Sequence, residues 1–251
     1  MKDLSKVTIS CTGLGDLMKE PKLVEDKKAG RLSEAAKEYL NGVFIRPKYN
    51  RKREIENKYF EKGRQVEEAG IALYCHLTDS YAEKNEEFIF NDLIHGVPDL
   101  IFGETKKASL VVDIKAPYDL WSFYKSRTAK IDKDYWWQLQ GYMALTNAPV
   151  ARLAYTLIDI TPKLLSDERR RLGWQLSATE NETTEFLDAM AQLTFNFTYK
   201  DIPDNERIFC FDVPRDNVAI ASIRAKVEKA REYLLELDSK AVFRVEQHHF
   251  G

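Results

Sequence analysis

The sequence predicts an α/β or α+β domain in which strands are flanked by helices. Three observations lead to this prediction: apolar runs of strand length, segments with apolar residues at helical spacing, and the alternation of the two along the chain. The 251 residues, 44% of them hydrophobic, suit one large domain or two small ones. Because no repeat or low-complexity linker divides the chain, we expect a single domain over residues 1–251.

The N-terminal part is predicted to be mainly helical. A short extended piece begins at Thr8 and leads into a helix over residues 14–18. Further helices are expected over residues 33–44 and from about Lys52 to His76. Between them, residues 46–64 hold eight basic and three acidic side chains, a local net charge of +5.

The middle of the chain carries most of the predicted strands. They cover residues 88–90, 97–103 and 110–115, and the polar stretch 104–108 makes a hairpin of the last two. The remaining elements alternate in type. They are a helix over 133–146, a strand over 151–160, a helix near 181–193, a strand near 207–212 and a helix near 217–238.

Composition excludes several classes of protein. The 38 Lys+Arg and 40 Asp+Glu residues give a net charge of −2, so no global basicity indicates nucleic acid. No apolar run approaches the roughly 18 residues that a membrane span needs, and the N-terminus has no apolar signal core, so we expect a cytoplasmic protein. Cys11, Cys75 and Cys210 form no C-x-x-C pair and cannot supply four thiolates to an iron–sulfur cluster.

Two aspartates and a lysine on the predicted hairpin form the first candidate site. Asp99 follows Pro98, and Asp113 and Lys115 lie on the second arm, with thirteen residues between the aspartates. Residues two apart on a strand point to one face, so Asp113 and Lys115 project together. Burying them among Val and Ile is costly without a purpose. A structural salt bridge at a sheet edge is the alternative.

A glutamate on the helix upstream is the second candidate. At about 100° per residue, Glu67 shares its side with Phe60, Ile71 and Tyr74, whereas Glu68 lies on the solvated side. We therefore choose Glu67 as the carboxylate aimed at the protein body. That both are ordinary surface charges is the alternative.

Gln138 and Tyr142 are the third candidate. They are four residues apart and are neighbours on one helix face. An apolar stripe through Trp136, Leu139 and Met143 leaves this pair on its flank, where it could border a cleft. A routine amphipathic boundary is the alternative.

These side chains together favour a metal-dependent hydrolase. The hard oxygens of Glu67, Asp99 and Asp113 suit Mg²⁺ or Mn²⁺, which bind through carboxylates and substrate phosphate. Lys115 could hold or deprotonate the attacking water. Phosphodiester hydrolysis is the reaction that these groups fit.

The motifs resemble those of a known superfamily. The run from Pro98-Asp99 to Asp113-Ile-Lys115 resembles the signature of the PD-(D/E)xK nucleases. The flanking motifs are similar to those of its exonuclease branch, which includes lambda-type phage exonucleases, YqaJ viral recombinases and RecB-type nuclease domains. These motifs are Gly63-x-x-x-Glu67 and Gln138-x-x-x-Tyr142. The resemblance covers about residues 60–160.

The resemblance implies a restriction-endonuclease-like core, a central mixed β-sheet flanked by helices. The catalytic core would span about residues 52–160, with an N-terminal helical segment (1–51) and a C-terminal strand/helix extension (161–251) packed on it. Metal would be bound by Glu67, Asp99, Asp113 and the carbonyl of Ile114. Lys115 would act on the water, and Gln138 and Tyr142 would support the site or the substrate phosphate.

The implied function is a Mg²⁺- or Mn²⁺-dependent DNA exonuclease without an iron–sulfur cluster. It would resect linear duplex DNA 5′→3′ in phage-type recombination, beside a single-strand annealing protein and as a trimeric ring, in a bacterial or phage-infected cell. The chain departs from the lambda-type enzymes before Thr8, where only Lys2 and Lys6 stand in place of an arginine that receives a 5′-phosphate. A structure-specific or restriction-like endonuclease and an inactive DNA-binding scaffold are the alternatives.

Basic side chains on both sides of the motifs are the expected DNA contacts. A solvated surface is the alternative interpretation for all of them. They are Arg51, Arg53, Arg64, Lys125, Arg127 and Lys130.

Overall fold

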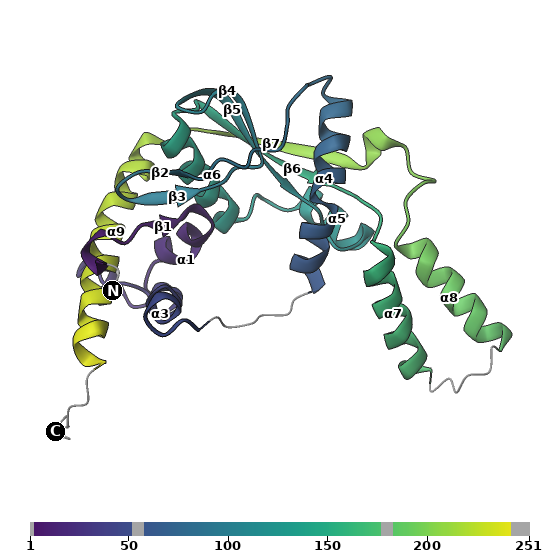
Figure 1. Cartoon of the computed structure of the whole chain (residues 1–251), viewed down its shortest axis with the longest axis horizontal. Coiled ribbons are helices and arrows are strands. Elements are labelled where there is room, and N and C mark those ends of the chain that lie inside the picture. The colour runs from purple at the N-terminus through teal and green to yellow at the C-terminus, as the bar shows by residue number, and fades with distance from the viewer. Residues whose placement is uncertain (1–2, 52–57, 177–182, 242–251) are drawn as a thin grey trace.

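The computed structural model describes residues 3–51, 58–176 and 183–241. Its centre is a four-stranded mixed sheet with strand order β4-β5-β6-β7 (Figure 1). The pairs β4–β5 and β6–β7 are antiparallel and β5–β6 is parallel. The strands are β4 (Leu100–Glu104), β5 (Lys107–Lys115), β6 (Val150–Thr156) and β7 (Ile208–Pro214).

A second, three-stranded sheet lies beside the first and was not predicted. In it β3 (Ile94–Gly96) pairs in parallel with β1 (Ile9–Ser10) and antiparallel with β2 (Ile89–Phe90). After β3 the chain passes through residues 97–99, which were predicted to be strand, before β4 begins at Leu100. The small sheet thus fixes the chain immediately before Asp99.

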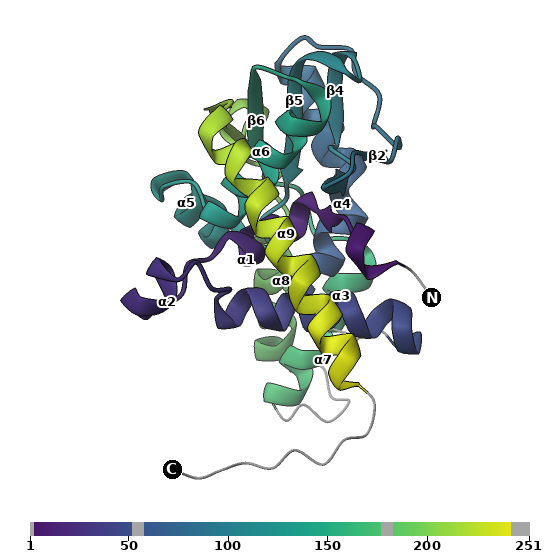
Figure 2. The same ribbon diagram turned by 90° about the vertical axis from the view of Figure 1, so that its left-hand side faces the viewer.

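Helices cover both faces of the central sheet. On one face lies α6 (Lys133–Thr146), backed by α1 (Leu14–Met18), α3 (Glu34–Tyr49) and α9 (Asn217–Lys240). Figure 2 shows α9 running past α1 and α3. One apolar cluster joins residues from all these helices to Val111 of β5.

On the opposite face α4 (Lys58–Leu77) packs Ile71 and Tyr74 against Val112 and Ile114 of β5. The alternation of β5 therefore separates two layers. The helices α7 (Pro162–Gln175) and α8 (Thr184–Asn196) contact each other and extend away from the sheet (Figure 1). The remaining short helices are α2 (Val24–Lys28), α5 (Leu120–Thr128) and the 3₁₀ turns Leu4–Lys6, Cys11–Gly13 and Asp204–Glu206.

The β4–β5 hairpin contains one irregularity. Leu100 pairs with Val112 and Phe102 with Leu110, but Gly103 pairs with Ala108, so the register shifts by one residue at Phe102/Gly103. Gly103 adopts φ +97°, which only glycine reaches without strain. The arrangement is a β-bulge with one extra residue on β5.

The end signals of α6 explain why its predicted bounds are confirmed. The Asp132 side chain accepts from the Asp134 N–H at the start, and Asn147 adopts the left-handed conformation at the end. Two helices were missed although similar signals stand before them. Asp119 and Ser122 form a capping box for α5, and Thr161 caps α7 ahead of Pro162.

Several predicted bounds are corrected. The strand expected to run to residue 160 ends at Thr156. The Leu157 N–H still bonds to the opposite Arg207 carbonyl, but the Arg207 N–H turns back to the Asp204 carbonyl and its side chain donates to the Leu157 carbonyl, so the ladder stops there. The helix expected over 33–44 continues to Tyr49, and the start of the helix predicted from Lys52 lies outside the described residues. No helix in the described ranges is long and apolar enough to cross a membrane.

Candidate active site

Asp113 and Lys115 project from one face of β5, toward α6. The Lys115 Nζ lies 2.6 Å from the Asp113 Oδ2, and the two side chains are 25% and 3% exposed. Burial lowers the pKa of Lys115, but the charges of Asp113 and Asp99 outweigh it, and the pKa lies above its usual value. Lys115 therefore stays charged at neutral pH.

Gln138 and Tyr142 hold Asp113 from the facing helix. The Gln138 Nε2 donates to the Asp113 Oδ1 and to the Tyr142 hydroxyl, both at 2.9 Å. The Tyr142 hydroxyl donates in turn to the Val97 carbonyl at 3.2 Å. A continuous hydrogen-bond chain thus ties β5 to the segment that precedes Asp99.

The sequence placed this pair on the flank of α6, and that prediction is wrong. Gln138 and Tyr142 are buried, whereas Trp136, assigned to the apolar stripe, is only half-buried. The reason is that α6 is packed against β5 on one side and α1 on another, so its buried arc is wider than a single stripe.

Asp99 lies next to Asp113 in the hairpin. Its Oδ2 accepts from the Ile114 N–H at 2.6 Å. Asn85 fixes the backbone here, since its N–H donates to the Asp99 carbonyl at 2.8 Å and its side chain to the Pro98 carbonyl at 3.0 Å. Burial and the charge of Asp113 raise the pKa of Asp99 to about 7.

Glu67 lies on the side of α4 that is nearer to the aspartates. Its charge contributes to the raised pKa of Asp99, and its carboxylate is 3.3 Å from the Lys84 Nζ. Glu67 is half-buried and Glu68 exposed, in the order that the sequence predicted. Phe60 was expected on the buried side but is 67% exposed, because the buried stripe of α4 includes Lys62, Val66 and Gly70 instead.

The donor set fits a hard divalent cation in its chemistry. Glu67, Asp99, Asp113 and the Ile114 carbonyl offer only oxygen. Burial is the main cause of the raised pKa of Asp99, and the charges of Asp113 and Glu67 add to it; a divalent cation would offset those two charges. Within the described ranges, however, no three acidic, His or Cys side chains converge as a ready ligand cluster. Asp113 is instead held by Gln138 and Lys115, and Glu67 by Lys84.

Comparison with known proteins gives structural matches only: no family model and no curated protein sequence matches the chain. A phage related exonuclease from Haemophilus somnus 129PT has a TM-score of 0.73 and 25% identity, covering 95% of this chain and 98% of its own. An alkaline exonuclease from Laribacter hongkongensis has a TM-score of 0.61 and 17% identity, covering 94% of each chain. The same alkaline exonuclease in complex with dAMP has a TM-score of 0.60 and 17% identity, covering 93% of each chain.

The chain has the fold of a phage-type exonuclease. The resemblance to the exonuclease branch of the PD-(D/E)xK nucleases is thereby confirmed, as is the predicted mixed sheet flanked by helices. The matches extend over nearly the whole chain, beyond the residues 60–160 that carry the motifs.

Tyr135 is a residue of this exonuclease fold that sequence reasoning missed. The Lys115 Nζ lies 4.9 Å from the centre of the Tyr135 ring, within the range of a cation–π contact. Tyr135 precedes Gln138 by three positions and Tyr142 by seven, and is therefore on the same face of α6. That spacing was the available signal.

The described parts of the basic stretch 46–64, residues 46–51 and 58–64, do not form one cationic surface on the exonuclease fold. Lys48 pairs with Asp238, Lys58 lies 3.1 Å from Glu168, and Lys62 is fully buried. The predicted DNA contacts Arg51 and Arg64 are exposed, as are Lys125, Arg127 and Lys130 on and just after α5, while Arg53 lies outside the described residues. Arg51 follows α3 and Arg64 lies on α4, apart in the sequence from the three cations on and after α5.

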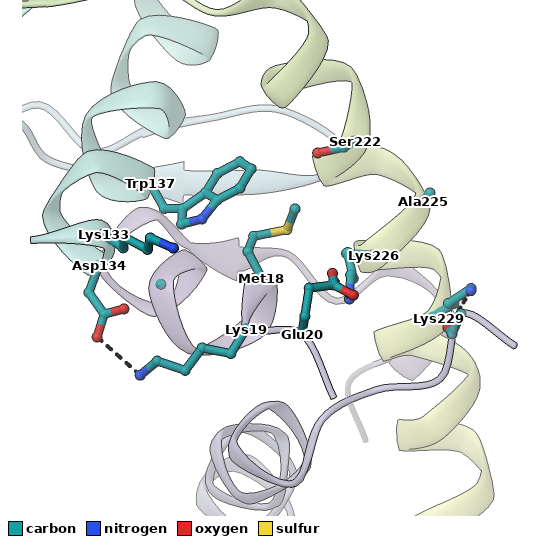
Figure 3. Close-up of a pocket in the computed structure, with 12 residues that line it drawn as sticks. Met18, Lys19, Glu20, Lys133, Asp134, Trp137, Ser222, Ala225, Lys226 and Lys229 are labelled. Carbon is teal, nitrogen blue, oxygen red and sulfur yellow. Dashed lines mark hydrogen bonds and ion pairs between the residues drawn. The ribbon is translucent and has the colours of Figure 1, made fainter. Parts of the chain in front are cut away.

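A cavity of about 620 Å³ lies on another side of α6, between it, α1 and α9. Figure 3 shows Lys133 and Trp137 of α6 facing Met18, with Lys19 joined to Asp134. None of the predicted site residues lines this cavity. The exonuclease fold therefore carries its candidate chemistry at the β5–α6 interface and not in this cavity.

Proposed function

We propose that the protein is a metal-dependent DNA exonuclease that hydrolyses phosphodiester bonds at the ends of linear duplex DNA. The observation that carries the proposal is the buried array in which Gln138 and Lys115 both hold Asp113, with Asp99 beside it. Two findings from the comparisons support it: a phage related exonuclease is similar over 95% of this chain, and a second exonuclease of the same fold was solved with dAMP.

The residues divide the proposed work between them. Gln138 fixes the orientation of the Asp113 carboxylate. Lys115, charged and close to Asp113, is placed to orient an attacking water by hydrogen bonding and to stabilise negative charge on the phosphate. Glu67, Asp99, Asp113 and the Ile114 carbonyl would hold Mg²⁺ or Mn²⁺, which when bound supplies a Lewis acid for the phosphate and lowers the pKa of water.

The finer parts of the proposal come from the family resemblance. They are 5′→3′ polarity, resection for phage-type recombination, a single-strand annealing partner, a trimeric ring and action in the cytoplasm. One chain would form a single nuclease domain with its catalytic core at about residues 52–160. An apolar cluster that includes Ile9, Val111 and Leu234 supports that organisation.

Digestion of linear duplex labelled separately at its 5′ and 3′ ends tests activity and polarity together. With Mg²⁺ or Mn²⁺ we expect mononucleotides released progressively from the 5′ end, and with a chelator no release. Release from the 3′ end would overturn the polarity alone. No degradation with either metal would overturn the proposed function.

Covalently closed duplex of the same sequence separates the alternatives. An exonuclease leaves it intact, whereas an endonuclease cuts it as readily as linear duplex. A protein that binds duplex ends but cuts neither substrate would be the inactive scaffold. Retention of Asp99, Asp113 and Lys115 favours an active enzyme over that scaffold.

A further inference from the structure

A buried lysine lies five residues before Glu67 on the same helix. Lys62 of α4 has a relative exposure of 0%. Its Nζ donates to the Pro117 carbonyl at 3.0 Å and to the Tyr118 carbonyl at 2.9 Å. Among the described residues, no carboxylate forms an ion pair with it. Burying an ammonium group that only backbone carbonyls hold costs free energy of folding, because the charge loses its hydration.

The surroundings of Lys62 only partly offset that cost. Its Nζ lies 5.9 Å from the centre of the Tyr199 ring. Asp119 and Asp159 attract the charge from a greater distance, yet burial still lowers the pKa of Lys62 to about 8. A methionine of similar shape would fill the same space without this cost, so packing alone does not explain the lysine.

The two carbonyls explain what a lysine adds. They belong to the segment that leaves β5 directly after Lys115, and this segment cannot extend the sheet because Pro117 has no N–H to donate. Buried carbonyls need a donor. Lys62 supplies it to two successive residues at once, and so fixes the direction in which the chain leaves β5.

Lys62 thus joins the two elements that carry the candidate carboxylates. It is five residues from Glu67 on α4, and its partner Pro117 is two residues from Lys115 on β5. On the α4 face no hydrogen-bond chain like that of Gln138 and Tyr142 links Glu67 to the aspartates within the described ranges. Lys62 makes a direct polar contact between α4 and the segment that follows β5, whereas Lys58 of α4 reaches that segment only through Glu168, which also accepts from the Tyr118 hydroxyl.

We propose that Lys62 is a positioning residue of the nuclease site, which sets the place of Glu67 relative to Asp113 and Lys115. The proposal rests on the proposed function and adds a residue that does not touch the substrate. Its effect would be carried by the register between α4 and the end of β5.

The test compares Lys62→Met with Lys62→Arg in the full-length chain. Methionine keeps the bulk and removes both hydrogen bonds, while arginine keeps donors. Lys229→Met is the matched control, because Lys229 also donates to a backbone carbonyl, that of Gly30, but between α9 and the N-terminal region. The readouts are kcat and KM on linear duplex, the Mn²⁺ affinity by calorimetry, and the unfolding midpoint.

We expect Lys62→Met, assayed well below its unfolding midpoint, to lower kcat about tenfold or more and to weaken Mn²⁺ binding, with KM little changed. Lys62→Arg should recover part of both losses, and Lys229→Met should have neither. A folded Lys62→Met protein with the kcat and Mn²⁺ affinity of the wild type would overturn the assignment. So would an equal loss in Lys229→Met, or a loss of kcat that only follows the fraction of folded protein.

Two further measurements keep the test decisive. If Lys62→Met does not fold, Lys62→Gln, whose shorter side chain cannot bridge both carbonyls, should show the same losses; if it does not fold either, Lys62 is a structural residue and the proposal fails. If the wild type degrades no DNA, the proposed function fails separately. The Mn²⁺ affinity and the amide exchange of residues 113–119 then test the positioning role of Lys62, since neither measurement needs turnover. Unchanged values in Lys62→Met would overturn that role.

Discussion

The two faces of the central sheet hold their polar groups differently. On the α6 face Asp113, Gln138 and Tyr142 are 2%, 5% and 3% exposed and are hydrogen-bonded to one another. On the α4 face the Glu67 side chain is 27% exposed and contacts Lys84 rather than an aspartate. On the α6 face the buried groups are already held by one another, and the Asp113 Oδ2, which has only its ion pair with Lys115, is the one buried side-chain oxygen of that group left without a hydrogen bond among the described residues. On the α4 face the carboxylate of Glu67 has a partner, Lys84, that it could exchange.

The groups on the α6 face are already fixed in place, whereas Glu67 on the α4 face would have to leave Lys84 to join the proposed site. Groups that are fixed before the substrate arrives lower the reorganisation needed in the transition state. Glu67 loses little free energy when it leaves Lys84, because ion pairs between partly exposed side chains are weak. The α6 face therefore sets the geometry of the proposed site, and the α4 face completes it.

The largest effect is expected from Asp113→Asn on the α6 face. The variant loses the charge that holds Lys115 and would hold metal, so nuclease activity should fall about a thousandfold. Initial rates on linear duplex measure it. The matched control is Asp212→Asn. Asp212 lies on β7, two strands from Asp113 in the same sheet, and the variant loses only its ion pair with Arg152, so it should keep its activity. Similar losses in both variants would remove Asp113 from the site.

A smaller effect is expected from Glu67→Gln on the α4 face. Loss of one carboxylate should weaken Mn²⁺ binding and lower activity about ten- to a hundredfold. Glu68→Gln, one residue along the same helix, is exposed and should behave as the wild type. Calorimetric Mn²⁺ titration of both proteins makes the comparison. The reverse order of effects would show that the wrong glutamate was chosen.

A still smaller effect is expected from Tyr142→Phe. It removes the hydroxyl that accepts from Gln138 and donates to the Val97 carbonyl, and should lower the free energy of unfolding by about 1–3 kcal/mol. Activity should fall only severalfold because Gln138 still contacts Asp113. Urea unfolding checks the first value, with the buried Tyr155→Phe as control. A fully inactive, stable variant would mean that the hydroxyl acts on the substrate.

The effect expected to be smallest on activity is a pH dependence of stability alone, which comes from Lys62 on the α4 face. Its pKa is about 8 in the folded protein and about 10.4 in an unfolded chain. Between these values the unfolded chain binds more protons at this position, so raising the pH favours folding, while below about pH 8 the burial cost is fully present. The stability of the wild type relative to Lys62→Met should rise between about pH 7 and pH 10, by at most about 3 kcal/mol. A difference that stays flat would contradict the lowered pKa.

Local signals predicted the elements that have clear ends. The bounds of α6 follow from Asp132 and Asn147, and the two layers around β5 follow from strict alternation in a single strand. The three-residue β3 could not be predicted in this way, because its ladder depends on strands that are distant in the sequence.

Spacing found the candidate residues but not their surroundings. Helical periodicity identified Gln138 and Tyr142 as neighbours, yet their burial depends on how α6 is enclosed by β5 and α1. Lys62 was only counted in the basic stretch 46–64, because a charged residue is exposed by default and only tertiary structure reveals the carbonyls that hold it. Which charges face each other is decided by packing.

The β-bulge in the β4–β5 hairpin decides whether the two aspartates point to the same face of the sheet, because it shifts the strand register by one residue. Without the bulge, the pairing of Gly103 with Ala108 near the turn would continue along the hairpin and bring Asp99 opposite Val112. The Val112 side chain points to the α4 layer. Beyond the extra residue, Ser109, Leu100 pairs with Val112, and that register continued by one residue brings Asp99 opposite Asp113 instead. Insertions or deletions of two residues in this hairpin can preserve the pair, whereas a change of one separates the carboxylates onto opposite faces of the sheet.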